Sequence, residues 1–300
     1  MFRLPSGVEI NNLIDDLKII SWKACDILYY YSKKVKDKRQ NKELIKYKNI
    51  DDPVTIADLK VNDLVISELK KRYPQTSWGF LSEENDEINI SNVDLQSEWL
   101  WVLDPLDGTK DYIQNTGEYA MHLALNYMNI PMLGIVLIPS RKELWIANGT
   151  KVWCENKEGL KWVPTFLNKK NISEMTVVTS KNHRNEELKL LLNKLGFSKT
   201  LTMGSIGCKI ASIMRGESDV YISLSLPGKS FPKDWDFAAP ETILVTGGGI
   251  ITDHHNKKLV YNKKDFNQSG IIIASNNINI QKDLCLKIKK ILVENKILPQ

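Results

Sequence analysis

The sequence predicts an α/β protein with an α+β N-terminal lobe and an α/β C-terminal lobe. Apolar residues first recur at helical spacing and then gather in short runs between turn residues. From Thr176 onward, strand-like and helix-like segments alternate, which is typical of an α/β unit. The 300 residues are enough for two lobes. A boundary within residues 160–173 predicts one lobe at 1–160 and the other at 161–300.

The first eighty residues predict two helices and a strand. Apolar side chains recur every three or four positions over residues 11–31, which indicates a helix. Residues 52–58 are expected to open a second helix that ends before Tyr73-Pro74. The short apolar run at 77–81 is typical of a strand. These elements would supply a helical layer and the first strand of a sheet.

Strands dominate the middle of the chain, and strands and helices alternate after it. Antiparallel strands separated by turn residues are predicted at 120–127, 132–138, 143–147 and 151–154. The alternating part predicts strands at 176–180, 198–203 and 219–223, with helices at 185–195 and 206–215. Another apolar helix begins near Asp236 and runs to Val245.

Two aspartates follow the most apolar strand of the chain. Residues 99–103 form a short, aromatic and branched run that predicts a buried strand, and Asp104 and Asp107 leave its end. Two carboxylates held close together repel each other unless a cation lies between them, and hard divalent cations prefer oxygen ligands. The backbone N–H groups of Gly108 and Thr109 are suited to hold a phosphate oxygen. These residues alone fit metal-assisted phosphate chemistry and an ordinary surface turn equally well.

Further acidic residues stand at the ends of predicted elements. Asp58 and Asp236 lie at helix starts, where an aspartate by itself most often caps the helix. Glu83 and Glu84 follow a strand, and as a pair they are typical of a polar loop. As a set, however, carboxylates from both halves of the chain could converge on one cleft. His122 lies within a predicted strand and is interpreted as a core histidine with satisfied hydrogen bonds.

Composition and charge narrow the class of protein. Apolar residues make up 42% of the chain and charged residues 26%, ordinary values for a soluble globular protein. The net charge of +5 is compatible with anionic small molecules, and no basic-aromatic repeat indicates nucleic-acid binding. No apolar run is long enough to span a membrane. The four cysteines are scattered along the chain, at Cys25, Cys154, Cys208 and Cys285, and predict neither a zinc site nor a disulfide framework. Free thiols are typical of a reducing compartment, so a cytoplasmic location is expected.

The acidic motifs together resemble a known superfamily. Asp-Pro-Leu-Asp-Gly-Thr at 104–109 is preceded by Ser-Glu-Glu at 82–84 and followed by Trp-Asp-Phe-Ala-Ala at 235–239. In this order they are similar to the motifs of the inositol monophosphatase superfamily, and the resemblance extends over residues 52–249. It implies a layered α-β-α-β-α fold and a Mg²⁺-dependent, lithium-sensitive phosphomonoesterase.

The residues after the first motif point to a branch of that superfamily. Lys-Asp-Tyr-Ile at 110–113 resembles the pattern of the 3′(2′),5′-bisphosphate nucleotidases of sulfur metabolism, and segments 179–184 and 204–209 resemble their nucleotide-contacting segments. Asn182 departs from the usual Ser/Arg-rich form of the first segment. The resemblance implies hydrolysis of 3′-phosphoadenosine 5′-phosphate to AMP and phosphate. An inositol or sugar phosphatase, and a non-catalytic relative that binds a phosphorylated ligand, remain alternatives.

The resemblance also implies a role for individual residues. Two or three Mg²⁺ ions would be held by Glu83, Asp104, Asp107, Asp236 and the backbone carbonyl of Leu106. Asp58 and Thr109 would orient and deprotonate the attacking water. The amides of Gly108 and Thr109 would hold the phosphate. His183, Ser205 and Lys209 would contact the nucleotide, with Lys209 neutralising the phosphate that is not cleaved. The expected partner is this small molecule, with no nucleic acid or membrane, and the protein is expected to be a monomer or homodimer.

Overall fold

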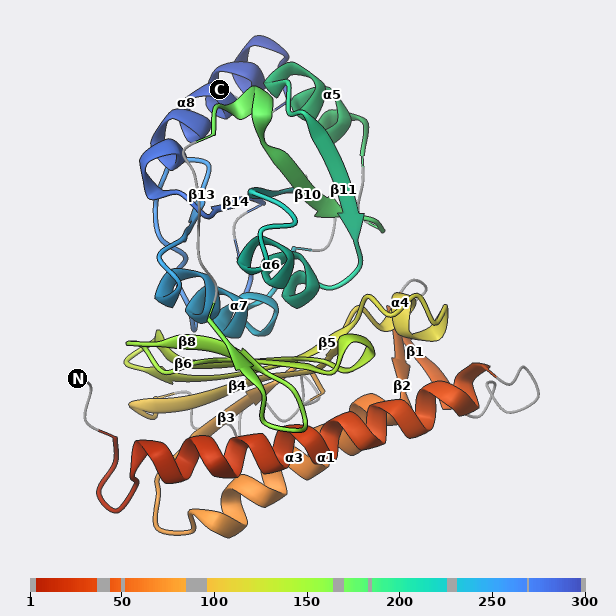
Figure 1. Cartoon of the computed structure of the whole chain (residues 1–300), viewed down its shortest axis with the longest axis vertical. Helices are drawn as coiled ribbons and strands as arrows, with labels where there is room; N and C mark the ends of the chain where they lie inside the picture. The colour runs from red at the N-terminus through yellow and green to blue at the C-terminus, as the bar shows by residue number, and fades with distance from the viewer. Residues whose placement is uncertain are drawn as a thin grey trace.

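The computed structural model describes residues 4–36, 44–49, 52–84, 96–163, 170–182, 185–225, 231–268 and 270–297. These residues form a seven-stranded sheet, a five-stranded sheet and a two-stranded pair, with helices on the faces of the larger sheets. Figure 1 shows five layers that alternate between helices and sheets. The α/β class and the layered α-β-α-β-α architecture expected from the sequence are therefore confirmed.

The first helical layer covers one face of the seven-stranded sheet. Its helices are α1 (Ile10–Lys36) and α3 (Ile56–Arg72). The sheet has the order β3-β4-β5-β6-β7-β8-β9, and only β3 and β4 run parallel within it. Its strands are β3 (Gly79–Ser82), β4 (Trp99–Asp107), β5 (Ala120–Tyr127), β6 (Ile130–Ile138), β7 (Glu143–Ala147), β8 (Val152–Glu155) and β9 (Lys161–Trp162).

The middle layer consists of α6 (Ile206–Met214) and α7 (Asp234–Thr246), which lie between the two large sheets. The five-stranded sheet has the order β11-β10-β12-β14-β13. Its strands are β10 (Thr176–Ser180), β11 (Lys199–Met203), β12 (Val220–Leu224), β13 (Ile250–Asp253) and β14 (Ile271–Ser275). Its outer face is covered by α5 (Glu186–Leu195) and α8 (Ile278–Glu294).

The alternation of side chains along β4 explains why the sheet is covered on both faces. Trp101 and Leu103 pack into the core against α1 and α3, whereas Leu100 and Val102 pack into the core that includes α6 and α7. Successive residues of a strand point to opposite faces, so an unbroken apolar run needs a helical layer on each side. The apolar run at 99–103 is therefore a consequence of the layered architecture.

One local prediction was wrong. Residues 52–55 do not begin the second helix. They form β2 (Asp52–Thr55), which pairs with β1 (Ile45–Asn49). The helix begins only at Ile56, with Thr55 as its N-cap. Pro53 is compatible with an edge strand as well as with a helix start, so the local sequence did not separate the two. The short elements α4 (Thr109–Ile113), η2 (Pro139–Arg141) and η3 (Ile172–Glu174) complete the described chain.

Candidate functional site

The end of β4 is irregular, and this irregularity brings two aspartates to one side of the sheet. Asp104 pairs with His122 of β5 and Asp107 pairs with Ala120, so β4 has one residue more than β5 between these two pairs. In a regular strand, residues three apart would point to opposite faces. The extra residue reverses the alternation, as a β-bulge does, and Leu106 points into the core beside α1 and α3 instead.

The bulge places an acidic cluster beside the middle helical layer. Carboxylate oxygens of Asp104, Asp107 and Asp236 all lie within 4.8 Å of one another. Asp104 is buried, and Glu83 follows β3 next to it, where its backbone N–H donates to the carbonyl of Leu103. Asp236 comes from the first turn of α7 and accepts a hydrogen bond from the backbone N–H of Lys233. The cluster thus joins residues that are far apart in the chain.

The electrostatics of this cluster fit a bound cation. Burial, together with the charges of Glu83, Asp107 and Asp236, raises the pKa of Asp104 well above its ordinary value. Burial and the charge of Asp107 raise the pKa of Asp236 to about 7. Carboxylates in such mutual repulsion gain stability when a positive ion lies among them, and an all-oxygen donor set suits a hard divalent cation. The residues present therefore fit a metal site.

Asp107 also fastens the cluster to the start of α6. Its Oδ2 atom accepts hydrogen bonds from the hydroxyl of Ser205 at 2.7 Å and from the backbone N–H groups of Ile206 and Gly207. These are N–H groups of the first helical turn, which have no partner within the helix. A negative charge at this position is stabilised by the helix dipole.

Asp58 and Thr109 lie close together although 51 positions separate them in the sequence. The Thr109 hydroxyl is 3.5 Å from Oδ1 of Asp58 and 3.1 Å from the carbonyl oxygen of Leu106. Oδ2 of Asp58 accepts from the backbone N–H and the hydroxyl of Thr55, so Asp58 also closes a capping box at the start of α3. Burial raises the pKa of Asp58 to about 7. Asp58 can therefore cap α3 through Oδ2 and face Thr109 through Oδ1 at the same time.

The predicted substrate contacts have different surroundings. Gly108 has a φ of +87°, and a Cβ there would lie 2.8 Å from the carbonyl oxygen of Glu118, so this turn needs glycine. Ser205 caps α6 and donates to Asp107. Lys209 is 2% exposed, and its Nζ donates to the carbonyl of Gly204 at 2.6 Å. His183 lies outside the described residues. The substrate contacts of all these residues stay predictions.

His122 is the residue whose environment the sequence misjudged. It is fully buried opposite Asp104, and neither ring nitrogen makes a well-formed hydrogen bond among the described residues. Its Nε2 lies 3.4 Å from Oδ2 of Asp107, and burial lowers the pKa of the imidazole. It is therefore a neighbour of the acidic cluster, not a satisfied core histidine. This environment depends on the pairing of β4 with β5, which places His122 opposite Asp104, and local sequence does not give that pairing.

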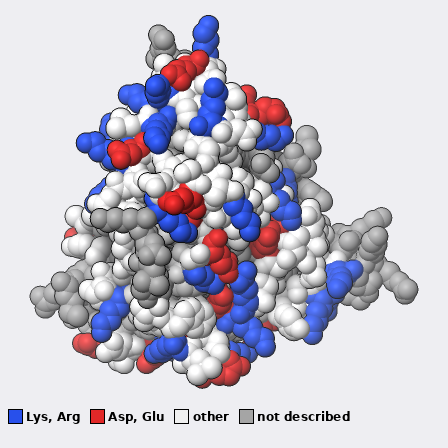
Figure 2. Space-filling model, turned by 45° about the horizontal axis from the view of Figure 1, so that its top comes forward, with Lys and Arg blue, Asp and Glu red and all other residues white. Residues whose placement is uncertain are grey.

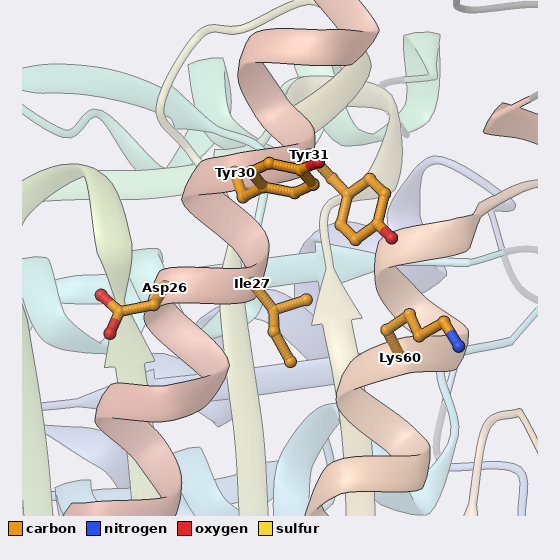
Figure 3. A pocket seen from close by; sticks show the side chains of 5 residues that line it. All are labelled: Asp26, Ile27, Tyr30, Tyr31 and Lys60. Carbon is orange, nitrogen blue, oxygen red and sulfur yellow. The ribbon is translucent and has the colours of Figure 1, made fainter.

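Other surface features lie apart from the cluster. A hollow of about 390 Å³ lies between α1 and α3. Figure 3 shows the residues that line it: Asp26, Ile27, Tyr30, Tyr31 and Lys60. Figure 2 shows Lys and Arg side chains distributed over one face and interspersed with Asp and Glu. Within the described part of the chain, no helix has the length and apolarity needed to cross a bilayer.

Comparison with known proteins identifies the kind of enzyme to which this site belongs. The chain is 30% identical over 220 residues to the 3′(2′),5′-bisphosphate nucleotidase CysQ of Salmonella typhimurium. The aligned part makes up 73% of this chain and 83% of that relative. The fold is similar to SuhB of Bartonella henselae, with a TM-score of 0.73 and 23% identity over 93% of this chain and 99% of that one. It is also similar to CysQ of Bacteroides thetaiotaomicron, with a TM-score of 0.67 and 23% identity over 88% and 97% of the two chains.

The layered fold and its acidic corner define a phosphatase, a hydrolase of phosphate monoesters. The model of the inositol monophosphatase family matches residues 18–292, and the chain belongs to this family. The resemblance inferred from the sequence motifs is therefore confirmed.

Proposed function

We propose that the protein is a Mg²⁺-dependent 3′(2′),5′-bisphosphate nucleotidase that converts 3′-phosphoadenosine 5′-phosphate to AMP and phosphate. The observation that carries the proposal is the convergence of Asp104, Asp107 and Asp236 beside the Asp58–Thr109 pair. Support for the nucleotide comes from the CysQ relatives and from the Lys-Asp sequence that follows Thr109.

In this proposal the ions are held by the carboxylates of the cluster, by Glu83 and by the Leu106 carbonyl. Two or three Mg²⁺ ions would supply positive charge that polarises the reacting phosphate and acidifies a water molecule. The protein itself holds the phosphate and orients the water. The Gly108 and Thr109 amides are the candidate donors to the phosphate oxygens.

Proton transfer is assigned to Thr109 and Asp58. The Thr109 hydroxyl accepts a hydrogen bond from the attacking water and donates its own proton towards Oδ1 of Asp58, 3.5 Å away. Asp58 suits this task because burial raises its pKa to about 7, near the pH at which a general base is most effective. The hydroxyl has a single proton, so the Leu106 carbonyl, 3.1 Å away, is its alternative acceptor, and this contact keeps Thr109 next to the cluster.

Several further properties belong to the same proposal. We place the enzyme in sulfur metabolism in the cytoplasm, which agrees with four free thiols in the described chain. We expect inhibition by Li⁺, a small-molecule substrate only, and a monomer or homodimer. The lobes are taken as residues 1–160 and 161–300, with the active site between them. Substrate roles for His183 and Ser205 are part of this proposal, whereas the buried Lys209 is assigned a supporting role through its hydrogen bond to the Gly204 carbonyl.

A substrate panel tests the proposal. Phosphate release would be measured from 3′-phosphoadenosine 5′-phosphate, its sulfated relative, inositol 1-phosphate and p-nitrophenyl phosphate, with Mg²⁺ and with EDTA. We expect a preference for the bisphosphate of at least about ten-fold, equivalent to ~1.4 kcal/mol, and no turnover in EDTA. A preference for inositol 1-phosphate would instead assign the protein to the inositol phosphatases. Full activity in EDTA would contradict the metal-dependent mechanism.

A further inference from the structure

A buried carboxylate that the proposed chemistry does not use lies one turn beyond the acidic corner. Asp111, on α4, has no exposed surface. Its Oδ1 accepts hydrogen bonds from the Thr116 hydroxyl at 2.7 Å and from Nζ of Lys181 at 3.1 Å. Its Oδ2 accepts from Nδ2 of Asn182 at 2.7 Å. Lys181 and Asn182 directly follow β10, so Asp111 connects α4, which follows the acidic cluster in the chain, to the end of a strand in the five-stranded sheet.

The turn before α6 is held at the same junction. A Cβ at Gly204 would lie 2.2 Å from Oδ2 of Asp111, so the carboxylate packs directly against the backbone there. Side-chain Oε2 of Glu118 accepts from the Gly204 N–H at 3.2 Å, and the Glu118 carbonyl accepts from the Ser205 N–H at 3.1 Å. Glu118 also lies 3.8 Å from Nζ of Lys181. Two segments of the C-terminal half thus meet one pair of acids.

We propose that Asp111 is a positioning residue for substrate specificity: through Lys181, Asn182 and the Gly204 turn, it fixes the surface that receives the part of the substrate beyond the reacting phosphate. This inference rests on the proposed nucleotidase function for the identity of that part, a nucleotide that carries a second phosphate. It extends the interpretation of the sequence, in which the Lys-Asp pair only marks a branch of the family.

Burial and charge explain why a carboxylate is needed at this position. A buried ionised group is stable only when its hydrogen bonds are satisfied, and Asp111 accepts from three side chains. Lys181 differs from Asp111 in that 38% of its side chain is exposed, and the bond to Asp111 raises the pKa of its ammonium. The ammonium has three N–H donors, so it can hold Asp111 and still offer a donor to an anionic group.

The location next to Thr109 gives the arrangement its functional meaning. Asp111 is two residues beyond Thr109 within the same short helix, and Ser205 is bonded to Asp107. Hydrogen bonds and a shared helix therefore connect the residues proposed to face the reacting phosphate with those proposed to face the rest of the substrate. Such preset positioning lowers the cost of ordering a ligand on binding.

Kinetics of Asp111→Asn test the inference, because asparagine keeps the shape but removes the charge that Lys181 needs. We expect KM for 3′-phosphoadenosine 5′-phosphate to rise at least about ten-fold, and KM for p-nitrophenyl phosphate to change less than about three-fold. Lys181→Met should give part of this effect. The double variant should resemble Asp111→Asn, because both substitutions remove the same contact. The matched control is Asp26→Asn, which removes another Asp–Lys pair between distant segments, Asp26–Lys157.

Amide hydrogen exchange gives a readout that does not depend on turnover. In Asp111→Asn, exchange should accelerate in peptides that cover residues 176–182 and 199–206, and it should be unchanged there in Asp26→Asn. Asn182→Ala removes one of the three bonds and serves if Asp111→Asn does not fold. Equal KM changes on both substrates with unchanged exchange would overturn the inference. A wild-type enzyme with no preference for the bisphosphate would refute the proposed function instead, while the exchange experiment would still decide whether Asp111 holds the two segments.

Discussion

Asp107 accepts a hydrogen bond from the backbone N–H of Ile206, the first residue of α6. The bond joins the bulged end of β4 in one sheet to the helix that begins the layer between the sheets. Oδ2 of Asp107 is thereby committed to the helix, while the same carboxylate belongs to the cluster with Asp104 and Asp236. The stability of the metal-free protein should consequently rise when Asp104 is substituted and fall when Asp107 is substituted.

Asp104→Asn should nearly abolish activity and stabilise the metal-free protein. Asp104 is buried among other carboxylates, which raises its pKa well above the ordinary value, so its ionised form destabilises the fold at neutral pH. Removing the charge relieves this repulsion. We expect Tm in EDTA to rise by ~2–4 °C for each kcal/mol gained. Initial rates and thermal melting in EDTA measure both effects, and a variant with a near-normal rate would remove Asp104 from the mechanism.

Asp107→Ala should lower both activity and stability. The substitution deprives the Ser205 hydroxyl and the first N–H groups of α6 of their acceptor. Loss of a helix cap and of charge-assisted hydrogen bonds costs about 1–3 kcal/mol. Urea denaturation in EDTA, alongside Asp104→Asn, is the measurement. If Asp107→Ala were as stable as Asp104→Asn, the bonds to α6 would contribute nothing.

Asp58 should give the activity a pH dependence near neutrality. Burial raises its pKa to about 7, although the hydrogen bonds from Thr55 oppose the shift. A base must be unprotonated to accept a proton, so kcat/KM should rise with pH through about 7 and be lost as Asp58 becomes protonated below it. Asp58→Asn should reduce the rate and remove this rise of kcat/KM with pH. Thr109→Ser keeps a hydroxyl and should retain much of the activity, whereas Thr109→Val should not. The measurement is kcat/KM as a function of pH for each variant. If kcat/KM of Asp58→Asn still rose with pH through about 7, the titrating group would be another residue.

Lys209→Met distinguishes two roles for a buried lysine. The sequence-based interpretation expects Lys209 to neutralise the phosphate that is not cleaved, which predicts a loss on bisphosphate alone. The structure favours a supporting role, because the ammonium is 2% exposed and holds the Gly204 carbonyl. We therefore expect rates on the bisphosphate and on p-nitrophenyl phosphate to fall by similar factors, about ten-fold each. A loss confined to the bisphosphate would restore the direct contact.

Local sequence was sufficient for most of the elements. Apolar periodicity predicted α1 and most of the strands, because buried faces must repeat with the period of the element. The β2 strand was missed because Pro53 suits a strand edge and a helix start equally well. The spacing of the acidic motifs indicated which carboxylates to consider together, since each follows a strand or begins a helix.

Tertiary structure alone decided how those carboxylates meet. Asp104 and Asp107 share a face only because β4 carries an extra residue opposite β5, and a bulge depends on pairing with another strand. Likewise, the sequence determined that Asp111 and Lys209 are charged, but burial and hydrogen-bond partners were decided by the packing of α4 and α6 against segments far along the chain. Charge is a property of a residue, whereas desolvation and proximity arise only when distant segments pack together.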